Sequence, residues 1–174
     1  VIVALSVYLA AMTTRIIPVD DFDLVIFGAT GDLAQRKLLP ALFHRDEQGQ
    51  IPDGACIIGT SRRAMSKAEY RDFAAKAIES HAKAMNATPE VVERFLNRLS
   101  YYAAEASKAD GWVALEQELA DRKDVVRVFY LAVGPDLFGS ICERLGQHNL
   151  VTPKSRVVVE KPLGKNGESA EATN

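Results

Sequence analysis

Cysteine and histidine are scarce in this sequence, which limits the metal and redox chemistry that we expect of it. The 174 residues include two cysteines, Cys56 and Cys142, and three histidines, His44, His81 and His148. A structural zinc site needs four such ligands at short spacings, and these scattered residues do not provide them. Both cysteines lie in apolar runs, so we expect two buried free thiols of the kind found in intracellular proteins.

An excess of charge of one sign is also absent. The 21 lysines and arginines nearly balance the 23 aspartates and glutamates, which gives a formal net charge of −2. Proteins that bind nucleic acids usually carry a basic excess, so we expect no nucleic-acid partner. The apolar share of 48% and the charged share of 25% are ordinary for a globular chain. The length allows one sizeable core, because a domain of about 150 residues buries roughly 70% of its unfolded surface.

Hydrophobic runs of membrane-spanning length are missing too. The apolar run Val1–Ala11 would span only about 16 Å as a helix, against a bilayer core of about 30 Å. It lacks the positively charged start of a signal peptide. Met12 and the following Thr-Thr-Arg-Ile resemble a natural start. We therefore expect residues 1–20 to be an apolar tail outside the native start, residues 21–174 to form one domain, and the protein to be cytoplasmic with no membrane partner.

Short apolar runs typical of buried strands alternate with helical periodicity along the chain. The predicted strands are 23–27, 55–59, 100–104, 125–133 and 156–160, and between them lie helical segments that start near 32, 66, 88, 109 and 135. The segment Ser66-Lys-Ala-Glu69 is a capping box, Thr88-Pro89 is typical of a helix start, and Pro40 should kink the first helix. This alternation predicts an α/β fold with a mainly parallel sheet.

The most informative segment is 27–34, Phe-Gly-Ala-Thr-Gly-Asp-Leu-Ala, which follows a predicted strand and opens a predicted helix. Dinucleotide-binding loops occur in this context. Gly28 would permit a tight turn, Gly31 would let the backbone approach a pyrophosphate, and Ala34 would keep the helix close to the strand. The loop indicates a Rossmann-type, doubly wound fold, with an ordinary glycine-rich turn as the alternative.

The end of the second predicted strand favours NADP over NAD. An NAD site usually has an acidic residue there, which binds the ribose 2′-hydroxyl. This chain instead has Gly59-Thr-Ser-Arg-Arg63, and the planar fork of an arginine suits a 2′-phosphate. A solvated basic loop is the alternative interpretation.

Three ordered segments resemble the glucose-6-phosphate dehydrogenase family. They are 28–42 (Gly-Ala-Thr-Gly-Asp-Leu-Ala-Gln-Arg-Lys-Leu-Leu-Pro-Ala-Leu), 129–133 (Phe-Tyr-Leu-Ala-Val) and 159–164 (Val-Glu-Lys-Pro-Leu-Gly). The resemblance runs from about Asp23 to the last residue. It implies an NADP-dependent oxidation of glucose 6-phosphate at C1 to 6-phosphoglucono-lactone, the first step of the oxidative pentose phosphate pathway, in a full-length homodimer or homotetramer.

The resemblance also implies roles for individual residues. Lys37 and Lys161 are similar to lysines that bind the sugar phosphate, and Pro162 to a proline preceded by a cis peptide bond that orients Lys161. The residues implied in coenzyme binding are Gly28, Ala29, Thr30, Gly31, Asp32, Leu33, Ala34, Gln35, Arg62 and Lys161.

The chain departs from the family pattern at two points. Gly134-Pro135 stands where the family commonly has two prolines, which bears on the rigidity of that loop. The family's catalytic segment, Arg-x-Asp-His-Tyr, is missing, since the chain has no Asp-His pair. We therefore expect the histidine base to lie beyond Asn174, the chain to be truncated before the catalytic domain, and these residues to be inactive alone.

Three alternatives are weighed against this interpretation. Oxidoreductases of the glucose–fructose type share Glu-Lys-Pro but prefer a G-x-G-x-x-G loop. Short-chain dehydrogenases need Tyr-x-x-x-Lys, which none of the five tyrosines provides. The third alternative is a non-catalytic NADP-binding module that senses redox state. The absence of a catalytic base agrees with it, although such a module has little need of Lys161.

Overall fold

The computed structural model describes residues 19–104 and 110–159, which form a parallel sheet covered by helices. The strands are β1 (Phe22–Phe27), β2 (Cys56–Ser61), β3 (Leu99–Ala103), β4 (Val126–Leu131) and β5 (Ser155–Val159). They are ordered β3-β2-β1-β4-β5, and every neighbouring pair is parallel. This order is that of a Rossmann-type sheet, so the predicted fold class is confirmed.

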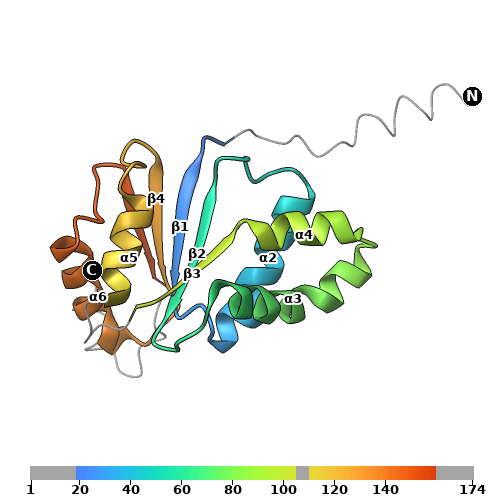
Figure 1. Cartoon of the computed structure of the whole chain (residues 1–174), viewed down its shortest axis with the longest axis horizontal. Coiled ribbons are helices and arrows are strands. Elements are labelled where there is room, and N and C mark those ends of the chain that lie inside the picture. Colours follow the sequence, from blue (N-terminus) through green and yellow to red (C-terminus); the bar gives the residue numbers. More distant parts are fainter. Residues whose placement is uncertain (1–18, 105–109, 160–174) are drawn as a thin grey trace, which may run out of the picture.

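Helices cover both faces of the sheet (Figure 1). One face packs against α2 (Leu39–Glu47), α3 (Lys67–Ala84) and α4 (Pro89–Asn97), and the other against α5 (Asp110–Leu119) and α6 (Phe138–Gln147). Two short elements complete the chain order, the π-helical η1 (Ala34–Leu38) before α2 and the 3₁₀-helical η2 (Pro135–Leu137) before α6. The helices that connect β1, β2 and β3 therefore lie on one face of the sheet, and those that connect β3, β4 and β5 lie on the other.

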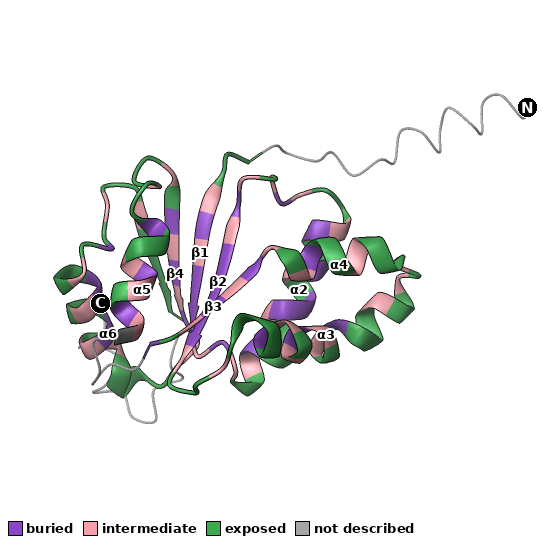
Figure 2. Ribbon diagram, in the orientation of Figure 1, coloured by how far each residue is buried: buried purple, intermediate pink, exposed green. Residues whose placement is uncertain are grey.

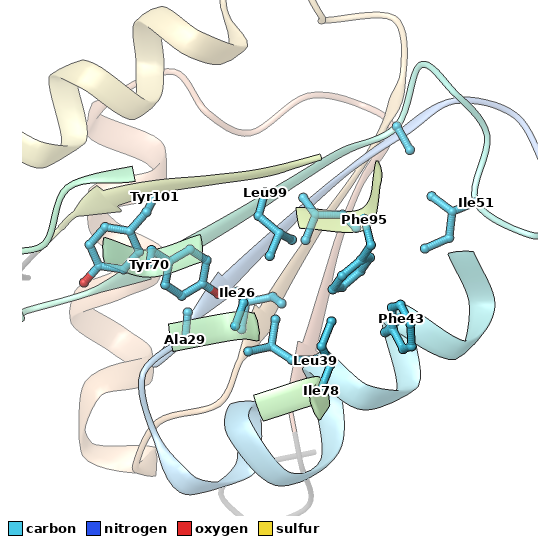
Figure 3. Packing of buried hydrophobic residues seen from close by; sticks show 13 residues of the cluster. Ile26, Ala29, Leu39, Phe43, Ile51, Tyr70, Ile78, Phe95, Leu99 and Tyr101 are labelled. Carbon is cyan, nitrogen blue, oxygen red and sulfur yellow. The ribbon is translucent and has the colours of Figure 1, made fainter. Parts of the chain in front are cut away.

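Two hydrophobic cores result, one on each face, and β1 contributes to both. Ile26 belongs to the core under α2, α3 and α4, whereas Val25 and Phe27 belong to the core under α5 and α6. The first core holds Phe43, Ile78 and Phe95 in its interior (Figure 3), and the buried residues follow the central strands (Figure 2). Side chains of successive strand residues point to opposite faces, so a strand in the middle of the sheet is apolar throughout.

The local helix signals behave as predicted, with one refinement at Pro40. Ser66 and Glu69 exchange both hydrogen bonds of the capping box, at 2.7 and 3.2 Å. Pro40 cannot donate a backbone hydrogen bond, and the helix responds with the π-helical segment η1, in which the N–H of Leu39 donates to the carbonyl of Ala34. A π-turn thus directly precedes Pro40, and the predicted kink of the helix stays a prediction.

Two buried aspartates are each neutralised by a pair of arginines, a feature that the sequence did not indicate. Asp46 of α2 lies 2.7 Å from Nε of Arg98 and 3.1 Å from the guanidinium of Arg94. Asp23 at the start of β1 is bound in the same way, by Arg122 at 2.6 Å and by the buried Arg127 at 3.3 Å. These pairs link elements far apart in the sequence and lie away from the carboxyl ends of the strands.

The prediction that both cysteine thiols are buried is wrong. Both thiols are free, but Cys142 is exposed and Cys56 is only half-buried. Cys142 lies on the amphipathic helix α6, whose buried residues are Ile141 and Leu145, so it falls on the solvent side. Within 19–104 and 110–159, no helix has the length and apolar content needed to cross a membrane, and no group of three or more potential ligands could hold a metal ion.

Candidate functional site

A cleft of about 760 Å³ opens at the carboxyl ends of the central strands, which is the lower edge of the sheet in Figure 1. Its lining comes from the ends of β1 and β2 and the segments that follow β1, β2 and β4, together with Ala104 after β3, Trp112 of α5 and Ile141 of α6. The crossovers from β1 and from β4 leave on opposite faces of the sheet, so the cleft lies at the topological switch point. Open α/β sheets bind their ligands at this point.

Gly28 ends β1 in a conformation that needs glycine. Its φ is +82°, and an added Cβ would overlap the carbonyl oxygen of Ala132, the residue that follows β4. The N–H groups of Gly28 and Ala29 both donate to the carbonyl of Thr60, at 2.9 and 3.0 Å. The loop is thus held between the ends of β2 and β4, as the predicted tight turn requires.

Gly31 lines the cleft and leaves room in front of the loop. The position of its Cβ meets only the carbonyl oxygen of Gly28, at 3.1 Å, and the helix follows at once from residue 32. A ligand can therefore approach this backbone closely, beside a helix N-terminus with unpaired N–H groups. The geometry is suited to a pyrophosphate.

Thr30 also lines the cleft, whereas the other residues of the predicted loop do not. Ala29 and Ala34 are fully buried, so their side chains hold the loop and the helix against the sheet. Asp32 forms an exposed ion pair with Arg36 at 2.7 Å, and Leu33 is half-buried. Gln35 and Lys37 are exposed on η1. Of the predicted coenzyme residues, the cleft is lined by Gly28, Thr30, Gly31 and Arg62.

The end of β2 supplies the basic wall of the cleft. Arg62 and Arg63 are exposed and both line it, and Arg62 forms no ion pair with any carboxylate of the described residues. Ser61 joins this wall to the glycine loop, since Oγ1 of Thr30 donates to its hydroxyl at 3.1 Å. A guanidinium that faces a cleft without a carboxylate partner can bind an anion.

The opposite wall begins at the end of β4 and is mainly apolar. Val133, Leu137 and Ile141 line it, with Asp136 as its carboxylate. Gly134 precedes η2 with φ −63° and ψ 149°, a conformation that proline also adopts. The loop therefore keeps a backbone compatible with proline, although a Cβ at Gly134 would lie 2.5 Å from Oδ1 of Asp136.

The sequence did not indicate three residues that the structure brings to this site, Trp112, Asp136 and Tyr101. Trp112 and Asp136 line the cleft, whereas Tyr101 of β3 lies behind the basic wall with its hydroxyl 2.7 Å from Oγ of Ser61. The parallel pairing of β2 with β3 could have suggested Tyr101, because the carboxyl ends of neighbouring strands share one edge. Glu160, Lys161 and Pro162 lie outside the described residues.

Comparison with known proteins agrees with this geometry. Residues 25–174 match the family model described as "Glucose-6-phosphate dehydrogenase, NAD binding domain". The chain is 47% identical over 163 residues to the glucose-6-phosphate 1-dehydrogenase of Rhizobium meliloti (strain 1021), covering 94% of this chain and 33% of the relative. It is 50% identical over 158 residues to that of Gluconobacter oxydans (strain 621H), covering 90% and 32%.

Solved structures give the same result. The crystal structure of glucose-6-phosphate 1-dehydrogenase from Mycobacterium avium is similar with a TM-score of 0.70 and 34% identity, over 88% of this chain and 32% of that one. A glucose-6-phosphate dehydrogenase in complex with its substrate glucose-6-phosphate is similar with a TM-score of 0.73 and 30% identity, over 92% and 34%. The chain spans about a third of the length of the relatives that it matches. By sequence and by structure, it belongs to the glucose-6-phosphate dehydrogenase family, where it corresponds to the NAD-binding domain.

Proposed function

We propose that the cleft binds NADP and that the chain is the coenzyme-binding part of a glucose-6-phosphate 1-dehydrogenase. One observation carries the choice of NADP. The exposed guanidinium of Arg62 lines the cleft at the end of β2, with no ion-pair partner among the described residues. An NAD-specific site would have a carboxylate there for the ribose 2′-hydroxyl. A 2′-phosphate would instead be bound by Arg62.

The size and the two walls of the cleft fit a dinucleotide. A volume of about 760 Å³ falls within the range of ligand pockets, roughly 300–1,000 Å³. Gly28, Thr30 and Gly31 line the cleft beside the start of the helix at residue 32, and the N–H groups of a helix N-terminus suit a pyrophosphate. Leu137 and Ile141 give the other wall an apolar surface. The cleft therefore offers a site for each charged group of NADP, with the glycine loop for the pyrophosphate and Arg62 for the 2′-phosphate.

The proposed reaction oxidises glucose 6-phosphate at C1 to 6-phosphoglucono-lactone, the first step of the oxidative pentose phosphate pathway. The nicotinamide supplies the acceptor for the hydride. The role of this chain in the reaction is to bind and orient the coenzyme. Lys37 and Lys161 are predicted to bind the sugar phosphate. A cytoplasmic homodimer or homotetramer of the whole enzyme belongs to the same proposal.

Titration calorimetry with NADP and NAD tests the coenzyme. We expect Arg62→Ala to weaken NADP binding by about 10- to 100-fold, the effect of losing a charge-assisted bond, and NAD binding by much less. Arg45→Ala is the matched control, because this exposed arginine on α2 contacts Gln50 and does not line the cleft. Equal weakening of both coenzymes by Arg62→Ala would contradict the proposal.

Turnover provides a second test. The absorbance of NADPH is followed after glucose 6-phosphate and NADP are added to the purified chain. We expect no NADPH, because these 174 residues contain no Asp-His pair to supply the predicted base. Measurable turnover would show that the base has been assigned to the wrong motif.

A further inference from the structure

The backbone on either side of Arg62 is tied to β3 by a ring of hydrogen bonds. The hydroxyl of Tyr101 donates to the carbonyl of Arg63 at 2.5 Å and lies 2.7 Å from Oγ of Ser61. The N–H of Arg63 then donates to Oγ of Ser61 at 3.1 Å and closes the ring. Arg62 lies between Ser61, whose hydroxyl belongs to the ring, and Arg63, whose backbone N–H and carbonyl belong to it.

Only one arrangement of hydroxyl protons satisfies this ring. A carbonyl can only accept, so the single proton of the Tyr101 hydroxyl goes to Arg63. The hydroxyl of Ser61 must therefore donate to Tyr101, and its oxygen accepts from the N–H of Arg63 and from Oγ1 of Thr30. Because Thr30 belongs to the glycine loop, the ring couples the pyrophosphate end of the cleft to its basic wall.

Packing keeps Tyr101 in one position. Its side chain is buried and lies against Tyr70 of α3, with 4.7 Å between the ring centroids (Figure 3). Tyr70 is itself fully buried and passes over Gly59 of β2, where a Cβ would lie 2.5 Å from the phenol ring. The hydroxyl of Tyr101 is therefore presented to the Ser61–Arg63 segment from a rigid support.

The geometry points to Tyr101 and Ser61 as positioning residues that set the selectivity of the cleft for a ligand with a 2′-phosphate. They hold the backbone that carries Arg62, so its guanidinium is directed into the cleft before the ligand arrives, which lowers the ordering cost of binding. This inference rests on the proposed binding of NADP at the same wall. Ser61 ends β2 and is held by its pairing with Ala103. Without the ring, Arg62 and Arg63 would sample other directions, and the loss would fall on the ligand that Arg62 contacts.

Tyr101→Phe removes only the hydroxyl and tests the inference. We expect the Kd for NADP to rise about tenfold, equal to about 1.4 kcal/mol, and the Kd for NAD to change by less than about twofold. Tyr102→Phe is the matched control, since its hydroxyl donates to Glu118 at 2.9 Å and takes no part in the ring. It should leave the ratio of the two constants unchanged.

Variants of Ser61 give an independent measurement if Tyr101→Phe folds poorly. Ser61→Ala should lower the same ratio, and Ser61→Thr, which keeps a hydroxyl, should restore most of it. The double variant Tyr101→Phe/Ser61→Ala should lose no more selectivity than either single change, because both break one ring. Circular dichroism identifies any variant that has lost its fold.

The outcomes separate this inference from the function on which it rests. If the unaltered chain binds NADP and NAD equally, the proposed coenzyme is wrong. If it prefers NADP and Tyr101→Phe keeps that preference, or weakens both ligands equally, the positioning role is wrong while the coenzyme stands. A selective loss in Tyr101→Phe and Ser61→Ala, with rescue by Ser61→Thr, supports both.

Discussion

Gly28 lies directly against the backbone of Ala132, so that a side chain at Gly28 would overlap the carbonyl oxygen of Ala132. Gly28 follows β1 and Ala132 follows β4, the two strands that flank the switch point. The N–H of Ala132 also donates to the carbonyl of Phe27 at 2.9 Å, so the contact is part of the sheet. Close approach of these strand ends shapes the floor of the cleft.

Gly28→Ala should therefore destabilise the fold by more than the strain of placing a side chain at a positive φ. Gly49→Ala is the control, since Gly49 has a similar φ of +68° but open space around its Cβ position. The control should cost about 1–2 kcal/mol, the strain of a left-handed residue, and Gly28→Ala at least about 2 kcal/mol more because the strand ends must separate. Urea unfolding of both variants measures the difference, and equal losses would contradict the overlap.

Arg98 offers a comparison of a buried and an exposed ion pair within one arginine. Its guanidinium contacts the fully buried Asp46 and the fully exposed Asp53, at 2.7 and 3.0 Å. Asp46→Asn should cost about 3 kcal/mol in the free energy of unfolding, because two arginines lose a buried counter-charge. Asp53→Asn should cost less than about 1 kcal/mol, since an exposed pair contributes little. A similar loss in both variants would mean that burial does not decide the strength of this network.

Much of the fold was predictable because its signals are local. The apolar run before Gly28, the capping box at Ser66 and the proline after Thr88 each specify an element within a few residues. Gly28 and Gly31 were identified for the same reason, since the loop that they form is continuous in the sequence. The exposure of Cys142 could not be predicted in this way, because an apolar stretch does not reveal which side of a helix faces solvent.

The parts of the site that were missed depend on pairing between distant segments. Tyr101 reaches Ser61 only because Gly59 of β2 is the register partner of Tyr101 in β3. Asp46 and Arg98 likewise meet only when α2 and α4 pack together. Neither the register of a parallel pair nor the packing of two helices follows from periodicity, so these contacts needed the structure.

High pH should destabilise the protein through Tyr102. Burial, the hydrogen bond to Glu118 and the charge of that carboxylate raise the pKa of Tyr102 to about 12. An unfolded tyrosine has a pKa of about 10. The stabilisation from this raised pKa is therefore fully present below about pH 10 and is lost as the pH rises through about 12. Absorbance of tyrosinate against pH measures the titration, and circular dichroism measures the fold.

Tyr102→Phe is the control for this titration. The variant should lose one tyrosinate step at high pH. Burial raises the pKa of Tyr101 and of Tyr70, so both should still ionise at a higher pH than free tyrosine. If every tyrosine of the folded chain ionises near pH 10, the burial of these three phenols is wrong.

Trp112 should report on ligand binding, because the single tryptophan of the chain lines the cleft. Its ring stacks with that of Phe27, at 5.5 Å between centroids, and with that of His148, at 6.0 Å. These contacts fix the indole, so a ligand in the cleft changes the environment of one defined chromophore. We expect NADP to change the tryptophan fluorescence in a saturable way, with the Kd that calorimetry gives.

Val113→Ala is the control, since this neighbouring side chain is exposed and does not line the cleft, and should leave the signal intact. Binding in calorimetry without any change in fluorescence would mean that the ligand occupies another part of the surface, because no other tryptophan is present to mask the effect.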